Sequence, residues 1–167
     1  MKLPRPLEVA AILGITVAFG SLLLWPVHAG KDSARKYACL SNVKQMALAC
    51  IMYASDYDDR FPNRDNWMDA SVPYLKDEDL LQCNILQRER KDPQIYGYAF
   101  NGQLSNAKLP RRPDFVELVF ESMNLARNAS GSKGSLPNPG RHKVGDGLPS
   151  NNVSYADGHA KAIASPP

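Results

Sequence analysis

Histidine and carboxylate side chains in the C-terminal half are the residues whose types could do chemistry. Glu121, His142, Asp146, Asp157 and His159 could meet if the end of the chain folds back as a hairpin. Mixed imidazole and carboxylate ligands suit a divalent metal, which makes the first four of these residues candidate ligands. Their spacing is not diagnostic, and a turn position for Asp157 or a cross-strand position for His159 explains those two residues equally well. We expect no cofactor, with calcium or another divalent metal as the alternative.

Three aspartates near residue 57 offer a second candidate cation site. Asp56, Asp58 and Asp59 crowd the predicted end of a helix, where the helix dipole disfavours negative charge. Their spacing matches no calcium loop, so a solvated helix end is the favoured interpretation.

Motifs of catalysis are absent from the sequence. It contains no Gly-rich phosphate loop, nucleophile elbow or zinc-protease helix. Cys39 and Cys50 lie in a stretch that resembles the buried side of a helix, which is a poor setting for a reactive thiol. We therefore expect that the protein is not an enzyme.

A long helix over the first 57 residues, broken or bent near Pro26, is the first element that must position these groups. Residues 7–25 are apolar except for Glu8, Thr16 and Ser21, and roughly 20 apolar residues cross a bilayer. After Pro26 the apolar residues recur at three- and four-residue steps, which indicates an amphipathic helix. This apolar stripe comprises Leu40, Val43, Ala47, Cys50 or Ile51, Ala54 and Tyr57.

The middle of the chain predicts one short helix and the first strands of a small antiparallel sheet. Residues 67–81 predict a short helix or turn, with Asp69 as a possible cap. Residues 95–104 alternate in polarity and contain Asn101-Gly102, a dipeptide favoured in two-residue hairpin turns. Residues 115–121 alternate well and form the best candidate strand.

The C-terminal part predicts a long loop followed by a hairpin. Residues 128–150 are rich in Gly, Ser, Pro and Asn, and loops of this length are usually functional or disordered. Asp157-Gly158 between alternating residues predicts a hairpin over residues 152–163. One long helix followed by several antiparallel strands defines an α+β fold.

Length and charge limit the organisation and the partners. A chain of 167 residues with one apolar segment leaves room for one domain, so we expect a membrane anchor over residues 1–30 and a head over residues 31–167. The net charge of +3 is spread along the chain without a dense basic cluster, which gives no support for nucleic-acid binding.

The topology of the apolar segment has two interpretations. Basic residues flank it on both sides, so the positive-inside rule does not fix its orientation. Val27-His28-Ala29 before Gly30 could be a signal peptidase site, although the apolar stretch exceeds the roughly 7–15 residues usual in a signal peptide. We favour an uncleaved anchor with the head outside.

The three cysteines leave more than one pairing open. Cys39 and Cys50 would stand roughly 16 Å apart along one helix, and a disulfide needs Cα atoms within about 7 Å. Cys83 could pair with either of them if the head is exported, and three reduced, buried thiols are the alternative.

Five segments in order along the chain carry a resemblance to a known family. They are residues 33–62 (SARKYACLSNVKQMALACIMYASDYDDRFP), 67–83, 96–105 (YGYAFNGQLS), 119–122 (VFES) and 141–161. Together they resemble the pilin-like proteins that carry a C-terminal His-X9-Asp-Gly motif, which are relatives of the type II secretion pseudopilins. The block from Cys39 to Pro62 is the most specific of the five.

The resemblance implies roles for individual residues. Glu8 occupies the place of a glutamate that pairs with the N-terminal amine of a neighbouring subunit in pilin-like assemblies, and Cys39 and Cys83 match cysteines that would form a disulfide. Gly14, Ala18 and Gly20 would let helices approach closely in the membrane. The family-motif positions are Cys39, Asn42, Gln45, Asp56, Tyr57, Asp58, Phe61, Pro62, Cys83, Tyr96, Gly97, Tyr98, Glu121, His142, Asp157, Gly158 and His159.

The chain departs from the family pattern at three places. Leu3 and Pro4 stand where the family has the glycine and phenylalanine of the prepilin peptidase site. Fourteen residues rather than nine separate His142 from Asp157, and Asn84 follows Cys83 where the family has proline. These differences indicate a divergent member.

The combined expectation is a pilin-like α+β protein, with a long N-terminal helix that spans the bacterial inner membrane and packs on an exported antiparallel head. It would be a structural subunit of a pseudopilin or type IV pilus-like filament, or of a type II secretion-like assembly. Its partners would be the membrane, other copies and other pilin-like subunits, and no nucleic acid. The alternative is a monomeric, anchored or secreted binding module that holds a ligand or calcium with residues 128–150 and the final hairpin.

Overall fold

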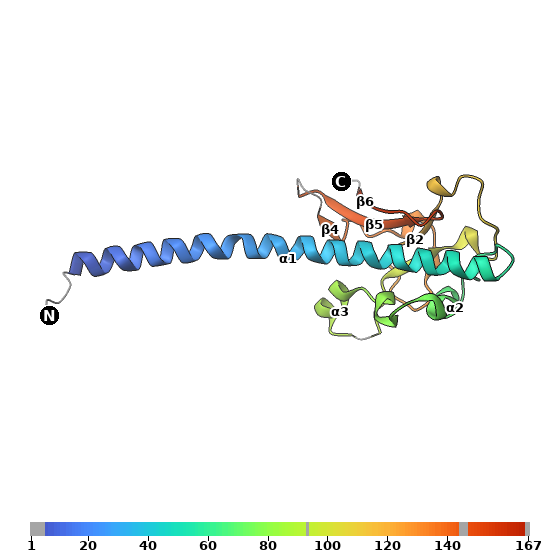
Figure 1. Cartoon of the computed structure of the whole chain (residues 1–167), viewed down its shortest axis with the longest axis horizontal. Coiled ribbons are helices and arrows are strands. Elements are labelled where there is room, and N and C mark those ends of the chain that lie inside the picture. Colours follow the sequence, from blue (N-terminus) through green and yellow to red (C-terminus); the bar gives the residue numbers. More distant parts are fainter. Residues whose placement is uncertain (1–5, 93, 144–146, 166–167) are drawn as a thin grey trace. The chain divides into compact units, whose positions relative to one another are not determined.

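A computed structural model describes residues 6–92, 94–143 and 147–165, and leaves out the side chains of residues 6–8, 11 and 22–33. By its internal packing the chain forms two compact units, residues 1–34 and 35–167, which are described separately here. Helix α1 (Pro6–Asp56) contributes to both units (Figure 1). It is not interrupted at Pro26, so the expected break is wrong: a proline removes one hydrogen bond of the helix, and the turns on either side remain.

The first unit consists of the N-terminal part of α1. The apolar side chains described there are 40–72% exposed: Val9, Ile12, Leu13, Ile15, Val17 and Phe19. Among the helices that the structure describes, none is both long and apolar enough to cross a membrane. The expected span over residues 7–25 includes side chains outside that description, and it stays a prediction.

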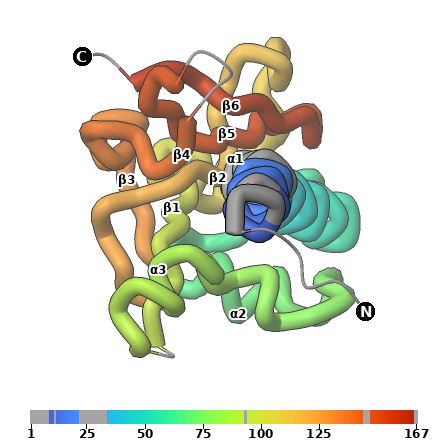
Figure 2. Tube along the Cα trace, turned by 90° about the vertical axis from the view of Figure 1, so that its left-hand side faces the viewer, coloured from blue at the N-terminus to red at the C-terminus, as the bar shows by residue number. Residues whose placement is uncertain are grey.

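The second unit contains a sheet in the order β3-β1-β2-β5-β4, with β6 also paired to β5 (Figure 2). The strands are β1 (Tyr98–Asn101), β2 (Glu117–Glu121), β3 (Ser130–Gly131), β4 (His142–Lys143), β5 (Pro149–Tyr155) and β6 (Ala160–Ala164). The β1–β3 pair is parallel and the others are antiparallel, so the α+β class is confirmed and the sheet is mixed rather than antiparallel.

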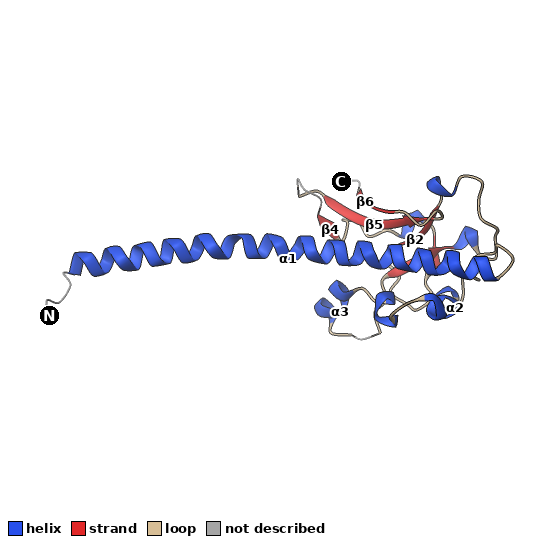
Figure 3. Cartoon of the chain, in the orientation of Figure 1, coloured by secondary structure: helices blue, strands red, loops and turns tan. Residues whose placement is uncertain are grey.

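Short helices complete this unit. In Figures 1 and 3 the C-terminal part of α1 has β4–β6 on one side and α2 (Trp67–Ser71) and α3 (Asn84–Arg90) on the other. The 3-10 helices are η1 (Val72–Tyr74), η2 (Glu78–Leu81), η3 (Gly102–Leu104), η4 (Pro113–Phe115) and η5 (Lys133–Ser135). Asp69 does not cap α2, because Asn66 holds that position and Asp69 instead pairs with Arg127 and Asn128.

The main core forms between the apolar stripe of α1 and the sheet. Cys39, Val43, Met46, Ala47, Cys50 and Ala54 are buried there. They belong to one cluster with Trp67, Tyr98 and Phe100, and the Trp67 indole donates a hydrogen bond of 2.9 Å to the carbonyl of Ala129. Because side chains alternate along a strand, Ala99 instead joins a smaller cluster with Phe120 and Val153. The predicted stripe is thus confirmed except at Tyr57, which is 53% exposed and stacks on Tyr53.

The hairpin expected at Asn101-Gly102 is wrong. A type I′ turn needs positive φ at both central residues, but Asn101 has a φ of −67° and ends β1. Its side chain accepts a hydrogen bond from Gln103 N, so it caps η3, and the antiparallel partner of β1 comes later, as β2.

The other strand predictions agree better with the structure. Strand β2 lies within the predicted residues 115–121, and β5 and β6 form the predicted C-terminal hairpin. Asp157 accepts a hydrogen bond from His159 N at its turn, and Gly158 has a φ of +87°. The expected loop over residues 128–150 is only partly irregular, because it contains β3, η5 and β4.

Candidate functional site

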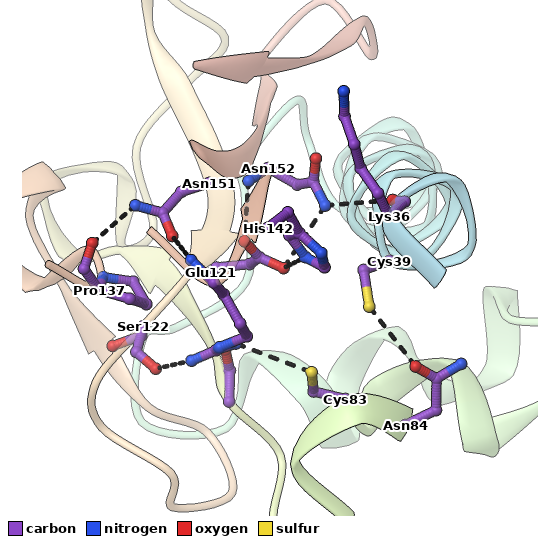
Figure 4. A network of polar contacts seen from close by, with 12 residues as sticks. Lys36, Cys39, Cys83, Asn84, Glu121, Ser122, Pro137, His142, Asn151 and Asn152 are labelled. Atoms are coloured by element: carbon purple, nitrogen blue, oxygen red, sulfur yellow. Dashed lines mark hydrogen bonds and ion pairs between the residues drawn. The ribbon is translucent and has the colours of Figure 1, made fainter. Parts of the chain in front are cut away.

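Glu121 and His142 form a buried polar pair inside the second unit. Glu121 ends β2 and His142 begins β4, and both strands lie beside β5. Glu121 is fully buried and His142 is 6% exposed, with 2.6 Å between Glu121 Oε1 and His142 Nε2. Glu121 Oε2 accepts a hydrogen bond of 2.9 Å from the backbone N–H of Asn152 (Figure 4). A buried carboxylate is costly unless it is hydrogen-bonded in this way, so the arrangement fixes both strands against β5.

Asn152 extends this pair to the long helix. Its side-chain amide donates to the carbonyl of Lys36 at 3.3 Å and lies 3.5 Å from Glu121 Oε1 (Figure 4). One amide therefore connects the first turns of α1 in this unit to the end of β2.

Two cysteines lie beside the pair. Cys39 on α1 and Cys83 just before α3 are both fully buried, and all three cysteines of the chain are free thiols. The expected Cys39–Cys83 disulfide is therefore not present in the structure. Cys39 instead donates to Asn84 Oδ1 at 3.6 Å.

The two thiols have opposite acidities. The pKa of Cys83 is lowered to about 6, chiefly because Cys39 hydrogen-bonds to it and also because the Arg141 guanidinium is near. The pKa of Cys39 is raised by the same hydrogen bond and by burial. Arg141 Nη1 lies 3.8 Å from Cys83 Sγ, so a positive charge faces the more acidic thiol.

Arg141 was not expected from the sequence, although it precedes His142. Its guanidinium donates to the carbonyl oxygens of Gly97 at 3.0 Å and of Ser122 at 2.7 Å. It thereby connects the entry of β1 to the exit of β2. A residue that acts through backbone carbonyls leaves no side-chain motif that a single sequence could show.

The structure brings together half of the predicted metal ligands. The Cys39 thiol, a Glu121 carboxylate oxygen and a His142 ring nitrogen all lie within 4.8 Å of one another. Asp157 does not join them, because it pairs with His159 at the turn after Tyr155, which faces Glu117 at the other end of β2. Asp146 lies outside the described residues. Cys39 was missed as a ligand, because only the packing of the helix against the sheet places it there.

The family-motif residues fall into three places. One is the buried cluster of Cys39, Cys83, Gly97, Tyr98, Glu121 and His142, in which burial and then both thiols and the carboxylate raise the pKa of Tyr98. The second is the exit of α1, with Asp56, Tyr57 and Asp58 exposed and Phe61 and Pro62 buried. The third is the turn of the last hairpin, with Asp157, Gly158 and His159. Asn42, Gln45 and Tyr96 lie outside these places and are half-buried.

The predicted assembly residues lie on the first unit. Gly14 and Gly20 have open space where a Cβ would stand, and Ala18 is exposed. Gly14 and Ala18 are four residues apart and share a helix face, whereas Gly20 is turned by roughly 120° from Gly14. The side chain of Glu8 lies outside the described residues.

A cavity in the head lies apart from the buried cluster. It has a volume of about 460 Å³ and lies between residues 133–138 and the last hairpin, with Asn151, Ile163 and Ser165 in its wall. The buried cluster itself is closed to a substrate-sized molecule, since its ionisable side chains are at most 6% exposed. The side chains of the buried cluster can therefore join segments of the head through hydrogen bonds or bind an ion, but they cannot reach a larger substrate.

Comparison with known proteins yields one family. A family model described as a protein of unknown function (DUF1559) matches residues 28–73, which cover the second part of α1 and the segment through α2. That family is associated with pilin-like and prepilin proteins. The match does not include Glu121, His142 or the last hairpin, so it does not test the His-X9-Asp-Gly motif. No curated protein and no solved structure matches the chain.

Proposed function

We propose that the chain is a structural subunit of a pilin-like filament or of a type II secretion-like assembly. In this proposal residues 7–25 anchor it as a single pass in the bacterial inner membrane, and the head is exported to the periplasm or beyond. The observation that carries the proposal is the row of apolar side chains over residues 9–19 that are 40–72% exposed within the chain. Large exposed apolar surfaces of this kind mark contacts with a membrane or another protein.

The matched family and the helix support the same function. The match to a family associated with pilin-like proteins covers residues 28–73, which include the buried residues of α1 in the second unit. Gly14 and Ala18 on one face of α1 would let a second helix approach closely, and such small residues favour helix association in lipid. The proposed mechanism is packing of α1 helices between copies or with related subunits.

Photo-crosslinking in membranes tests the helix contact. A photoreactive residue at Val17, which is 72% exposed, should yield crosslinked dimers and higher species. Gly14→Leu should lower that yield several-fold, because a Cβ added there meets nothing within 4 Å among the described residues, whereas the leucine side chain would separate two packed helices. Thr16→Leu, about 200° away on the helix, is the matched control and should leave the yield unchanged. A chain that crosslinks to no copy or related subunit from any position over residues 9–19 would refute the assembly.

Glu8→Gln separates assembly from charge pairing. If Glu8 pairs with a neighbouring amine, the neutral variant should lose crosslinks under the same conditions. Unchanged crosslinks would remove the pairing and leave helix packing as the mechanism. The intact mass of the membrane-bound chain should retain residues 7–25, whereas a soluble chain that starts at Gly30 would contradict the anchor.

The cavity in the head favours a second candidate function. Its wall comes from the segment over residues 128–150 and from the last hairpin, the two parts expected to hold a ligand in a monomeric binding module. A monomer in detergent, with a small molecule that protects Lys133 from amine labelling, would support this module instead.

A further inference from the structure

The buried cluster contains more metal-binding side chains than the hydrogen-bonded pair needs. Its ligand atoms, which lie within 4.8 Å of one another, are the Cys39 thiol, a Glu121 oxygen and a His142 nitrogen. They come from α1, β2 and β4, and each residue is at most 6% exposed. Cys83, from a fourth segment, directly precedes Asn84, whose Oδ1 accepts a hydrogen bond of 3.6 Å from the Cys39 thiol.

The Tyr98 hydroxyl is a further polar group of this cluster. Tyr98 is fully buried, and among the described residues its oxygen has no hydrogen-bond partner. Burial raises the pKa of Tyr98, and the nearby Cys39, Cys83 and Glu121 raise it further. Buried hydroxyl groups are normally paired, so Tyr98 has hydrogen-bonding capacity left for a water molecule or for a ligand of a bound ion.

The donors and charges of the cluster fit one metal. Zinc prefers four ligands drawn from thiolate sulfur, imidazole nitrogen and carboxylate oxygen, with Zn–S near 2.3 Å and Zn–N about 2.0–2.1 Å. Two thiolates, one carboxylate and a neutral imidazole around Zn²⁺ carry one net negative charge. The Arg141 guanidinium, 3.8 Å from Cys83 Sγ, would balance that charge.

We propose that Cys39, Cys83, Glu121 and His142 bind one zinc ion in the core of the head. The ion would replace the proton shared by His142 Nε2 and Glu121 Oε1, and these two atoms, which are 2.6 Å apart in the metal-free protein, would move apart to admit it. It joins four segments that are distant in sequence, and thus performs the cross-linking that a disulfide performs in many exported domains. The inference does not depend on the proposed assembly, because it concerns the head alone.

The test uses the full chain, purified in detergent under reducing conditions without a chelator. Elemental analysis should find about one zinc per chain, and Co²⁺ in its place should give the visible bands of tetrahedral cobalt with thiolate charge transfer in the near ultraviolet. Removal of zinc by a chelator should lower the melting temperature of the head, and added zinc should restore it.

Variants identify the ligands. Cys39→Ser and Glu121→Gln should each weaken zinc binding by about 100-fold or more. Cys50→Ser is the matched control, because Cys50 is equally buried on the same helix but contacts Ser71 and should leave binding unchanged. If Cys39→Ser fails to fold, the thiolate charge-transfer band of cobalt bound to the unaltered chain shows whether a cysteine binds the metal.

Four results would overturn the zinc site. The first is a reduced chain that takes up neither zinc nor cobalt, and the second is an equal loss of binding in Cys50→Ser and Cys39→Ser. The third is a Cys39–Cys83 disulfide in peptides of the protein as isolated, and the fourth is exclusive uptake of copper(I).

Discussion

At the scale of the residue, Gly97 stands where neither the backbone nor its neighbours accept a side chain. Its φ is +78°, and an added Cβ would lie 2.5 Å from Leu86 Cδ1 and 3.3 Å from Cys83 Cβ. We expect Gly97→Ala to lower the free energy of unfolding by about 1–3 kcal/mol, as measured by urea denaturation. Gly147 has a φ of +82° with nothing within 4 Å of its added Cβ, so Gly147→Ala measures the backbone cost alone. Equal losses in the two variants would show that packing around Gly97 contributes nothing.

Asp69 makes the stability of the head depend on pH. Hydrogen bonds from Asn128 and then from Arg127 lower the pKa of this carboxyl group. Because the folded pKa lies below the unfolded value, the stabilisation is present above the unfolded pKa of about 3.9 and is lost as the pH falls through the folded pKa. Asp69→Asn should cost about 0.5–1 kcal/mol near neutral pH, which allows for the exposure of the pair to solvent.

Unfolding of both proteins in urea between neutral pH and about pH 3 checks this dependence. The difference between the two curves should shrink as the pH falls below the unfolded pKa of about 3.9 and through the lowered pKa of folded Asp69. A constant difference across the range would mean that the carboxylate charge plays no part.

The residues of the buried polar cluster could be predicted from the sequence only in part. The sequence indicated that Glu121 and His142 could meet, together with Asp146, Asp157 and His159, if the end of the chain folds back as a hairpin. Cys39 and Arg141 were not predicted, since their roles depend on the rotation of α1 over the sheet and on two backbone carbonyls. A single sequence shows which helix face is apolar, but not which sheet residue that face meets.

At the scale of the element, β5 depends on two buried serines that differ in their partners. Ser154 Oγ donates to the carbonyl of Val119 at 2.7 Å and accepts from its N–H at 3.2 Å, where the register between β2 and β5 shifts. Ser150 Oγ is also buried but has no hydrogen-bond partner among the described residues. The same residue type therefore has opposite roles at the two ends of one strand.

We expect Ser154→Ala to lower the free energy of unfolding by about 1–3 kcal/mol, because it leaves two buried backbone groups of Val119 unpaired. Ser150→Ala, as the matched control, should be neutral or stabilising. Hydrogen exchange of the Val119 amide should quicken in Ser154→Ala only. Similar stabilities of the two variants would contradict the role of this bridge.

Elements were predictable where local chemistry and tertiary packing agree. Strand β2 and the final hairpin follow from alternation and from Asp157-Gly158, whose glycine adopts the positive φ that the turn requires. Asn101-Gly102 carries an equally good turn signal, but its asparagine caps η3, because the partner of β1 lies elsewhere. A dipeptide such as Asn-Gly makes a turn possible, but the strand pairing of the whole sheet determines whether that turn forms.

At the scale of the whole molecule, the chain divides into two units, and the sheet and the core belong to the second of them. Residues 35–167 contain the sheet, both core clusters and the buried polar cluster. We expect a fragment of residues 35–167 to fold cooperatively, because the residues described in its two core clusters all lie within that range. Calorimetry and near-ultraviolet circular dichroism of the fragment check this, and a broad, non-cooperative transition would contradict it.

Composition predicts a boundary near residue 30, since an apolar segment precedes an amphipathic one. What residues 7–25 contact was not determined by that pattern, because an apolar helix face suits a lipid and another helix equally well. Crosslinking at Val17 addresses that question directly.

Trp67 gives the isolated head a built-in optical probe. The chain has two tryptophans, and residues 35–167 retain only this one. Its indole is fully buried, stacks on Phe100 at 5.8 Å between ring centroids and is hydrogen-bonded to Ala129 just before β3. Its fluorescence should therefore shift to longer wavelength when α2 leaves the sheet, so that a single emission spectrum reports the docking of one helix without any label.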